Sequence, residues 1–251
     1  MCPINLVGFD LDDCLFDSTG LSERARIKGI EAMIDLGLKI NRQEAFDTIQ
    51  EIVKEHGSNF GKHYDYFIRR LNHLRSDINL SYNTQYKYIA AAIIAYHREK
   101  VDSIKLYNDV EKCLIMLKKK NIKSIIISDG SPVKQNEKIL RLGLDKLIDS
   151  VFITNEIGIK KPNPKLFDYC LDMVGVKASE ALYIGDRIDM DINPAKKCGI
   201  HTIYIHRGGK YDYHNESREI NDEGKPDYEI SSLSEIFSII DTINDQQHSI
   251  V

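Results

Sequence analysis

The sequence lacks the features that mark secreted, membrane or nucleic-acid-binding proteins. Its five cysteines are scattered, odd in number and without a C-x-x-C pair, which argues against a disulfide framework and against a zinc site. No apolar run approaches the length of a membrane span, and the run before Asp10 is too short for a signal-peptide core. The net charge of −4 leaves no basic excess for nucleic acid. We therefore expect a cytoplasmic protein with no membrane or nucleic-acid partner.

The sequence does contain a short apolar run that ends abruptly in acid. Residues 5–9 predict a buried parallel strand, and four aspartates follow within eight residues. Asp10 and Asp12 are two positions apart, so in an extended chain they point the same way. Two such carboxylates resist joint ionisation, and a divalent cation such as Mg²⁺, which takes carboxylate oxygens, removes that penalty. An acidic turn without chemistry is the alternative, and a second acidic cluster later in the chain argues against it.

The later part of the chain alternates strands with helices, which indicates a parallel sheet with right-handed crossovers. The expected strands cover residues 5–9, 123–128, 150–154, 181–184, 202–205 and 228–230. Residues 18–100 show only helical periodicity, although an ordinary crossover unit needs on the order of 30 residues. We predict an α/β fold: a Rossmann-like parallel-sheet core, residues 1–16 and 101–251, with an all-helical cap domain, residues 17–100, inserted after the first strand.

Polar side chains stand just past the ends of four expected strands. In strand order they are Asp10 and Asp12, Ser128, Lys161, and then Asp186, Asp189 and Asp191. Because the carboxyl ends of parallel strands meet at one edge of a sheet, we expect these groups around one point.

This set of side chains suits the chemistry of a phosphate ester. A carboxylate that attacks phosphorus gives an aspartyl-phosphate. The attack brings an anion to a dianion, so a metal ion and a lysine are needed to neutralise charge. A serine hydroxyl donates one hydrogen bond, and a second carboxyl group can protonate the leaving alcohol.

Four motifs resemble those of the haloacid dehalogenase-like (HAD) hydrolase superfamily. They are Asp-Leu-Asp-Asp-Cys-Leu from Asp10, then Ser128, Lys161-Pro162, and Gly185-Asp186 with Asp191. The helical insertion resembles that of the subfamily with a small helical cap, and the whole chain is most similar to archaeal magnesium-dependent phosphatases. The resemblance implies a Mg²⁺-dependent phosphatase that hydrolyses a small phosphorylated metabolite through an aspartyl-phosphate intermediate. Triose phosphates and phosphoglycolate are the substrates that it suggests.

The resemblance also implies a role for each charged residue of the site. Asp10 is expected to be the nucleophile and a metal ligand. Asp12 is expected to be the general acid and base, with its backbone carbonyl on the metal. Lys161 is expected to steady the nucleophile and the phosphate, although the adjacent Lys160 makes this assignment ambiguous. Asp186 is expected to be a metal ligand, with Asp191 supporting the metal indirectly.

The phosphate itself is expected to bind at the end of the second strand. By resemblance, Ser128 donates from its hydroxyl, and the backbone amides of Asp129 and Gly130 reach phosphate oxygens. The sequence departs from the family pattern at Cys14, where threonine or valine is usual, and at Asp129, where asparagine is frequent. Neither departure removes a charged catalytic group.

Other readings of the same residues stay open. A sugar phosphomutase shares both aspartates, whereas a 2-haloacid dehalogenase or a phosphonate hydrolase would leave Asp12 without a task. A regulatory module that keeps the scaffold is the alternative outside enzymes. The sequence leaves the oligomeric state open, with a homodimer the commonest outcome. It also leaves open the role of residues 206–226 and the question of which cap residues set specificity. Residues 57–62 are the best candidate for a cap loop that faces the active site.

Overall fold

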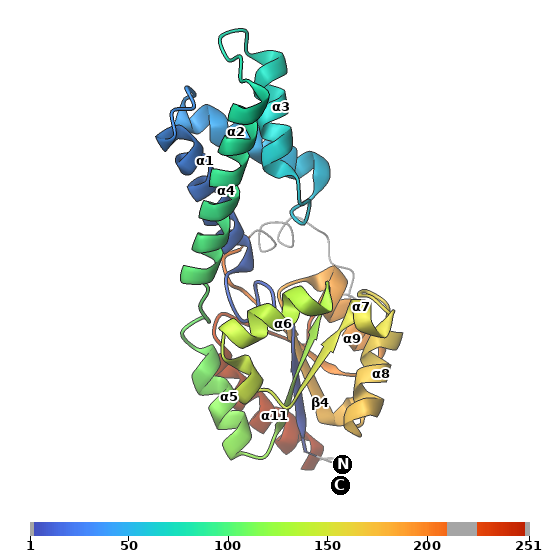
Figure 1. The fold of residues 1–251 in the computed structure, drawn as a ribbon. Helices are drawn as coiled ribbons and strands as arrows, with labels where there is room; N and C mark the ends of the chain where they lie inside the picture. The colour runs from blue at the N-terminus through green and yellow to red at the C-terminus, as the bar shows by residue number, and fades with distance from the viewer. Residues whose placement is uncertain (1–2, 210–224, 249–251) are drawn as a thin grey trace. The chain divides into compact units, whose positions relative to one another are not determined.

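The computed structural model describes residues 3–209 and 225–248 (Figure 1). The chain divides into two compact units. Unit 1 combines residues 1–19 with 105–251 and holds the sheet, and unit 2 is residues 20–104. Residues 210–224, the greater part of the segment without a predicted role, lie outside the described residues.

The sheet of unit 1 has six parallel strands in the order β3-β2-β1-β4-β5-β6. The strands are β1 (Leu6–Phe9), β2 (Lys123–Ser128), β3 (Ser150–Ile153), β4 (Ala181–Gly185), β5 (His201–Ile205) and β6 (Tyr228–Ile230). The chain order reverses direction beside β1, which is where open α/β sheets bind their ligands. The predicted α/β fold with a Rossmann-like parallel sheet is confirmed.

Helices cover both faces of this sheet. They are α5 (Val110–Lys119), α6 (Pro132–Arg141), α7 (Thr154–Ile157), α8 (Lys165–Val174), α9 (Asn193–Lys197) and α11 (Ile236–His248). In Figure 1, α8 lies on one side of the sheet, and α5 and α11 lie on the other. β1 is buried along its whole length because it has strands on both sides and helices on both faces. This explains why the strand is a continuous apolar run.

Unit 2 consists of helices, and residues 20–104 contain no strand. Its helices are α1 (Ser18–Asp35), which begins just before the unit, α2 (Arg42–His56), α3 (His63–Leu74) and α4 (Tyr82–Asp102). Asn41 caps α2, since its side chain accepts from the backbone amides of Gln43 and Glu44. The unit has an apolar core of its own that includes Tyr64 and Phe67.

Two properties expected of the chain concern its surroundings. Of the helices in the part of the chain that the structure describes, none combines the length and apolarity that a membrane crossing needs. The four described cysteines, Cys14, Cys113, Cys170 and Cys198, are free thiols.

Candidate active site

The ends of three neighbouring strands bring the predicted side chains to one edge of the sheet. β1 lies between β2 and β4, and Phe9 pairs with Ile184 in register. The amide of Asp10 continues this ladder by donating to the carbonyl of Ile184 at 2.9 Å. Ser128 is the last residue of β2, and Asp186 directly follows β4. Asp10 therefore emerges beside both.

The ammonium group of Lys161 joins several of these residues. It donates to Asp10 Oδ1 and Asp191 Oδ1 at 2.6 Å each, and to the hydroxyl of Tyr183 at 2.9 Å. An ammonium group has three protons, and these contacts use all of them. The Lys161 side chain is 2% exposed, so solvent screens these interactions little. Lys160 is exposed, and the structure thus places Lys161 in the site.

Asp191 reaches Lys161 because of an unusual turn after β4. It belongs to η3 (Ile188–Ile192), a single π-helical turn. Its other carboxylate oxygen accepts from the backbone amide of Arg187 at 3.2 Å. Gly185 lies directly against Asp191, and a Cβ atom at that position would overlap the carboxylate. The glycine of the Gly185-Asp186 motif therefore provides space for Asp191.

Negative charge exceeds positive charge around Lys161. Burial raises the pKa of Asp186 to about 9, and the carboxylates of Asp10 and Asp191 add to this rise. Burial also raises the pKa of Asp10 to about 7, although the Lys161 ammonium opposes the rise. Within the described residues, Asp186 forms no ion pair with a basic side chain. A divalent cation would relieve this excess of carboxylates.

Asp12 is held by different side chains and has the opposite pKa shift. Lys138 Nζ lies 2.7 Å from each carboxylate oxygen, and Gln135 Nε2 donates to Oδ2 at 3.1 Å. Burial acts to raise the pKa of Asp12, but the Lys138 ammonium and these hydrogen bonds outweigh it, and the pKa is lowered. Asp10 and Asp12 are thus two neighbouring acids in two distinct environments, which is the usual basis for giving two carboxylates different tasks.

The predicted phosphate-binding residues lie together in the turn after β2. Gln135 Nε2 is 2.6 Å from Ser128 Oγ and 2.9 Å from the carbonyl oxygen of Asp129. The Asp129 carboxylate accepts from the backbone amide of Lys161 at 3.4 Å. Gly130 has a φ of 135°, a conformation that favours glycine.

The sequence patterns did not reveal three side chains of the site, Tyr183, Gln135 and Lys138. Tyr183 is part of an apolar strand, and it pairs in register with Gly8 of β1. A Cβ atom at Gly8 would lie 2.7 Å from the tyrosine ring, so a glycine opposite a tyrosine was a usable signal. Gln135 and Lys138 are one helical turn apart, but nothing in the sequence shows that this face of α6 meets Asp12.

Two further aspartates have their hydrogen-bond and ion-pair partners outside this cluster, although the Asp13 carboxylate adds to the rise in the pKa of Asp186. Asp189 forms an ion pair with Arg187 at 2.8 Å and its side chain is 43% exposed. Asp13 is buried, and its carboxylate accepts from the amide and the hydroxyl of Thr19 at 2.8 and 2.6 Å. Asp13 therefore fixes the start of α1.

The ligands predicted from the sequence for a metal are two carboxylates and one carbonyl. Among the described residues, no three His, Cys, Asp or Glu side chains form a group that could hold a metal by themselves. The predicted set needs only the carboxylates of Asp10 and Asp186 with the backbone carbonyl of Asp12. Mg²⁺ binds proteins in this way, because it keeps several of its waters and takes one or two carboxylates. The residues present therefore fit magnesium.

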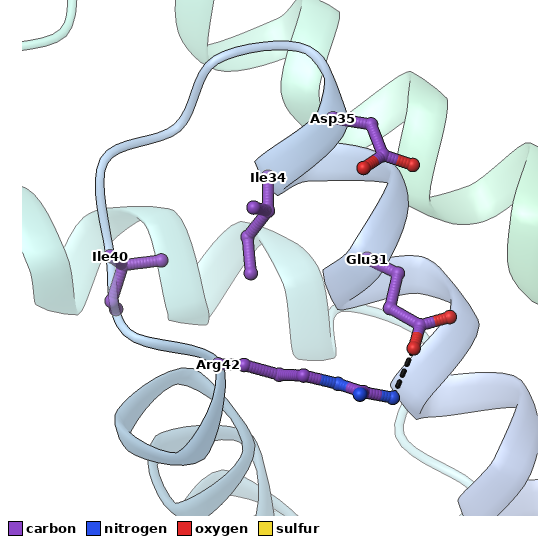
Figure 2. Close-up of a pocket in the computed structure, with 5 residues that line it drawn as sticks. All are labelled: Glu31, Ile34, Asp35, Ile40 and Arg42. Carbon is purple, nitrogen blue, oxygen red and sulfur yellow. Dashed lines mark hydrogen bonds and ion pairs between the residues drawn. The ribbon is translucent and has the colours of Figure 1, made fainter.

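A pocket of about 310 Å³ lies within unit 2 and contains none of these residues. Its lining consists of Glu31, Ile34, Asp35, Ile40 and Arg42 (Figure 2). Figure 2 shows Arg42 extending to Glu31, with which it forms an ion pair. The pocket is open to solvent, and it brings together no set of groups that indicates chemistry.

Comparison with known proteins identifies the family to which the chain belongs. A family model described as a haloacid dehalogenase-like hydrolase matches residues 4–199. The chain belongs to this family of hydrolases. Within the family the chain is a phosphatase, as its similarity to proteins named for that activity shows. Proteins named glyceraldehyde 3-phosphate phosphatase from Methanopyrus kandleri and Pyrococcus furiosus are each 39% identical to it, over 94% and 97% of this chain and 97% and 96% of theirs. The protein of that name from Methanocaldococcus jannaschii is 38% identical over 92% of this chain and 95% of its own.

Solved structures with low sequence identity share the fold. An HAD phosphatase from Thermococcus onnurineus has a TM-score of 0.61 and 23% identity, over 94% of this chain and 97% of its own. A 2-haloacid dehalogenase from Pseudomonas syringae has a TM-score of 0.57 and 22% identity, over 95% and 99%. These two reactions on one fold show that the fold does not select the reaction.

Proposed function

We propose that this phosphatase hydrolyses the phosphate ester of a small metabolite through an aspartyl-phosphate on Asp10. One observation carries the proposal: Asp10 and Asp12 are held by separate lysines. Lys161 holds Oδ1 of Asp10, and the described residues offer its Oδ2 no hydrogen-bond partner. Oδ2 is therefore the oxygen available to attack phosphorus, while Lys138 keeps Asp12 apart for proton transfer.

The two carboxyl groups would divide the reaction between them. The lowered pKa of Asp12 means that it has to take up a proton when the phosphate dianion binds beside it, since a nearby negative charge favours the neutral acid. In the first step, Asp10 attacks phosphorus, the bond from phosphorus to the ester oxygen breaks, and Asp12 gives this proton to that oxygen. In the second step, a water molecule attacks phosphorus, its proton passes to Asp12, and the bond between phosphorus and Asp10 breaks. Asp12 thereby regains the proton that it donates in the next turnover.

The remaining residues would hold the phosphoryl group. Ser128 would donate from its hydroxyl, and the amides of Asp129 and Gly130 would meet further oxygens. Lys161 supplies positive charge between Asp10 and the phosphate. Such preorganised donors act where charge develops in the transition state.

Magnesium would be held by Asp10, Asp186 and the backbone carbonyl of Asp12. When bound, the ion would neutralise phosphoryl oxygens and offset repulsion of the incoming dianion. The support is the raised pKa of both carboxyl groups, which reflects negative charge without enough compensation. Asp191 would act indirectly, because its contact with Lys161 fixes the ammonium beside Asp10.

For the substrate we propose a triose phosphate, with glyceraldehyde 3-phosphate first. The support is the shared name of archaeal relatives that this chain matches over nearly their whole length. We also propose that the helical insertion, residues 17–100, is a cap that selects the ester, with residues 57–62 as its specificity loop. A cytoplasmic location, a homodimer and the absence of a nucleic-acid partner stay predictions.

A sugar phosphomutase is the second candidate because it would use the same two aspartates. A 2-haloacid dehalogenase is less well supported, since a halide leaves without a proton and Asp12 would have no task. Lys138 and Gln135 both contact the Asp12 carboxylate. A carboxylate fixed in this way favours a reaction in which the leaving group needs a proton. The products distinguish a mutase from a phosphatase. A mutase returns an isomeric phosphate ester, whereas a phosphatase releases inorganic phosphate.

The test is release of inorganic phosphate from a panel of small phosphate esters, with Mg²⁺ and after chelation. We expect release from glyceraldehyde 3-phosphate with Mg²⁺ and loss of release after chelation, restored by added Mg²⁺. The Asp10→Asn variant serves as the control for contaminating phosphatases. Full activity after exhaustive chelation would overturn the metal assignment, and an isomeric ester as the main product would favour the mutase.

A further inference from the structure

Lys138 of α6 is the charged residue nearest to Asp12, and neither the motifs nor the family resemblance gives it a role. We propose that Lys138 is the positioning residue of Asp12: it fixes the carboxyl group where its proton reaches the oxygen of the leaving alcohol. The proposal rests on the proposed function, because it requires Asp12 to act as general acid.

The contact between the two residues constrains Asp12 strongly. Lys138 Nζ is 2.7 Å from Oδ1 and 2.7 Å from Oδ2, so it restrains the rotation of the carboxylate as well as its place. The Asp12 side chain is 32% exposed. Without a partner, a side chain with this much exposure would keep rotamer freedom that must be lost in each turnover.

Gln135 cannot supply this restraint alone. Its amide nitrogen has two protons but lies within hydrogen-bond distance of three oxygens. These are Ser128 Oγ at 2.6 Å, the Asp129 carbonyl at 2.9 Å and Asp12 Oδ2 at 3.1 Å. The contact with Asp12 is the longest of the three. The Ser18 hydroxyl also donates a hydrogen bond to Asp12. Lys138 contacts both carboxylate oxygens and carries the opposite charge, so we take it as the principal restraint on Asp12, with Gln135 linking Asp12 to the phosphate turn.

Lys138 is itself held in place by the loop that carries Asp12. Its Nζ lies 5.8 Å from the centre of the Phe16 ring, and its side chain is 21% exposed. Phe16 is fully buried, and its carbonyl accepts from the amide of Asp13 at 3.0 Å. The loop from Asp12 to Phe16 is thus closed on itself. The ion pair of Lys138 and Asp12 therefore has both of its side chains restrained. In a surface ion pair both side chains move freely, and the pair contributes little to stability.

The proposal predicts a selective loss of activity. A positioned acid contributes on the order of 10²- to 10⁴-fold when the leaving group needs a proton, and far less when it does not. In Lys138→Met, we expect kcat to fall about tenfold more for glyceraldehyde 3-phosphate than for p-nitrophenyl phosphate, because a phenolate leaves without help. Lys138→Arg should bring the ratio of kcat for the two esters most of the way back to the wild-type value, since a guanidinium contacts both oxygens of a carboxylate.

The experiment measures kcat and KM for both esters at saturating Mg²⁺. Lys119→Met is the matched control, because Lys119 is an exposed lysine at the end of α5. Thermal unfolding shows whether each variant is folded, and Lys138→Gln replaces Lys138→Met if the latter is not. Lys138→Met, or Lys138→Gln in its place, is also made in the Asp12→Asn background. There it should change the ratio between the esters by less than about twofold, because two residues that act as one unit are not additive.

Equal losses on both esters in Lys138→Met would overturn the proposal and leave Lys138 as a structural or phosphate-binding residue. A full additional loss in the Asp12→Asn background would overturn it too. Failure of the proposed function gives a different result: Asp12→Asn would itself lower both esters equally. If Asp12→Asn changes the ratio and Lys138→Met does not, only the role of Lys138 is wrong.

Discussion

At the scale of single residues, the site is defined by carboxyl groups that outnumber their cations. Asp10 and Asp191 share the Lys161 ammonium, whereas Asp186 has no basic partner among the described residues. Burial raises the pKa of both Asp10 and Asp186. The metal-free protein should therefore keep protons on these acids well above the ordinary carboxyl range. Binding of a divalent cation would have to displace those protons.

This excess charge predicts an unusual pH dependence of stability for the metal-free protein. The folded pKa of Asp186 is about 9, against an ordinary value of 3.8. Between these values the folded state holds a proton that the unfolded state has released, so the free energy of unfolding falls as the pH rises. The contribution of this bound proton to the free energy of unfolding is complete below about pH 4 and is lost as the pH approaches 9.

We therefore expect the Tm of the metal-free protein to fall between pH 5 and pH 9. Asp186→Asn should flatten the fall, because an amide has no charge to bury. MgCl₂ should raise Tm most at pH 9, where less proton must be displaced. Thermal unfolding in chelator and in MgCl₂ measures each of these. A Tm that is independent of pH in the wild type would show that Asp186 is not an uncompensated acid.

The motif residues could be predicted from sequence, and their supporting residues could not. Asp10, Ser128 and Asp186 follow apolar strands, so parallel topology alone brings them together. Tyr183 and Lys138 depend on packing between elements. A strand tyrosine is expected in any core, and a helix lysine is expected in solvent. Which face of α6 meets the loop after β1 is decided by tertiary structure that no local pattern encodes.

At the scale of elements, the π-helical turn after β4 is the feature with the strictest requirement. The turn directs Asp191 toward β4, where only a glycine at position 185 leaves room for its carboxylate. The same principle applies to Gly8 of β1, which leaves room for the ring of Tyr183. The glycines of two adjacent strands thus make space for two partners of Lys161.

Gly185→Ala should therefore act on catalysis through Asp191. We expect kcat/KM to fall about 100-fold, because a shift on the order of 1 Å in a supporting group has effects of this size. The free energy of unfolding should fall by about 1–3 kcal/mol, as for other overpacked sites. Gly209→Ala is the control, since a Cβ atom there would contact nothing within 4 Å and Gly209 lies outside the proposed specificity loop. Wild-type kinetics in Gly185→Ala would show that the contact between Asp191 and Lys161 does not matter for turnover.

The expected strands agree with the observed strands to within one residue at each end. The first expected strand began at residue 5, and β1 begins at Leu6. The rise in polarity after Phe9 and Ser128 marks the strand ends sharply. α4 extends from Tyr82 to Asp102 and is longer than its apolar stripe, because helix ends continue through polar residues that only contact solvent.

At the scale of the whole molecule, the two units are expected to divide chemistry from selection. Unit 2 has its own core, in which Tyr64 is buried and its hydroxyl lies where any Cβ at Gly29 would be. Phe60 is only partly buried and stacks on His56, with ring centres 4.6 Å apart. Phe60, in the loop of residues 57–62, is therefore the aromatic residue that we propose for contact with an ester, whereas Tyr64, in α3, is a core residue.

Phe60→Ala should change the ranking of phosphate esters while Tyr64→Ala should lower stability. Loss of a buried aromatic side chain costs about 3–5 kcal/mol, so the Tyr64 variant should show a large fall in Tm. The measurement is kcat/KM for several esters of different size, with Tm for each variant. A uniform change across all esters in Phe60→Ala would mean that residues 57–62 do not select the substrate.

The central claim of this account is that the phosphoryl group is transferred to the carboxylate of Asp10. The most direct measurement is acid quench of the enzyme in the first turnover with ³²P-labelled glyceraldehyde 3-phosphate, followed by peptide mapping. We predict a label on the peptide that contains Asp10, released by hydroxylamine as expected of an acyl phosphate and absent from Asp10→Asn. A label on another residue, or turnover by Asp10→Asn at the wild-type rate, would contradict the account.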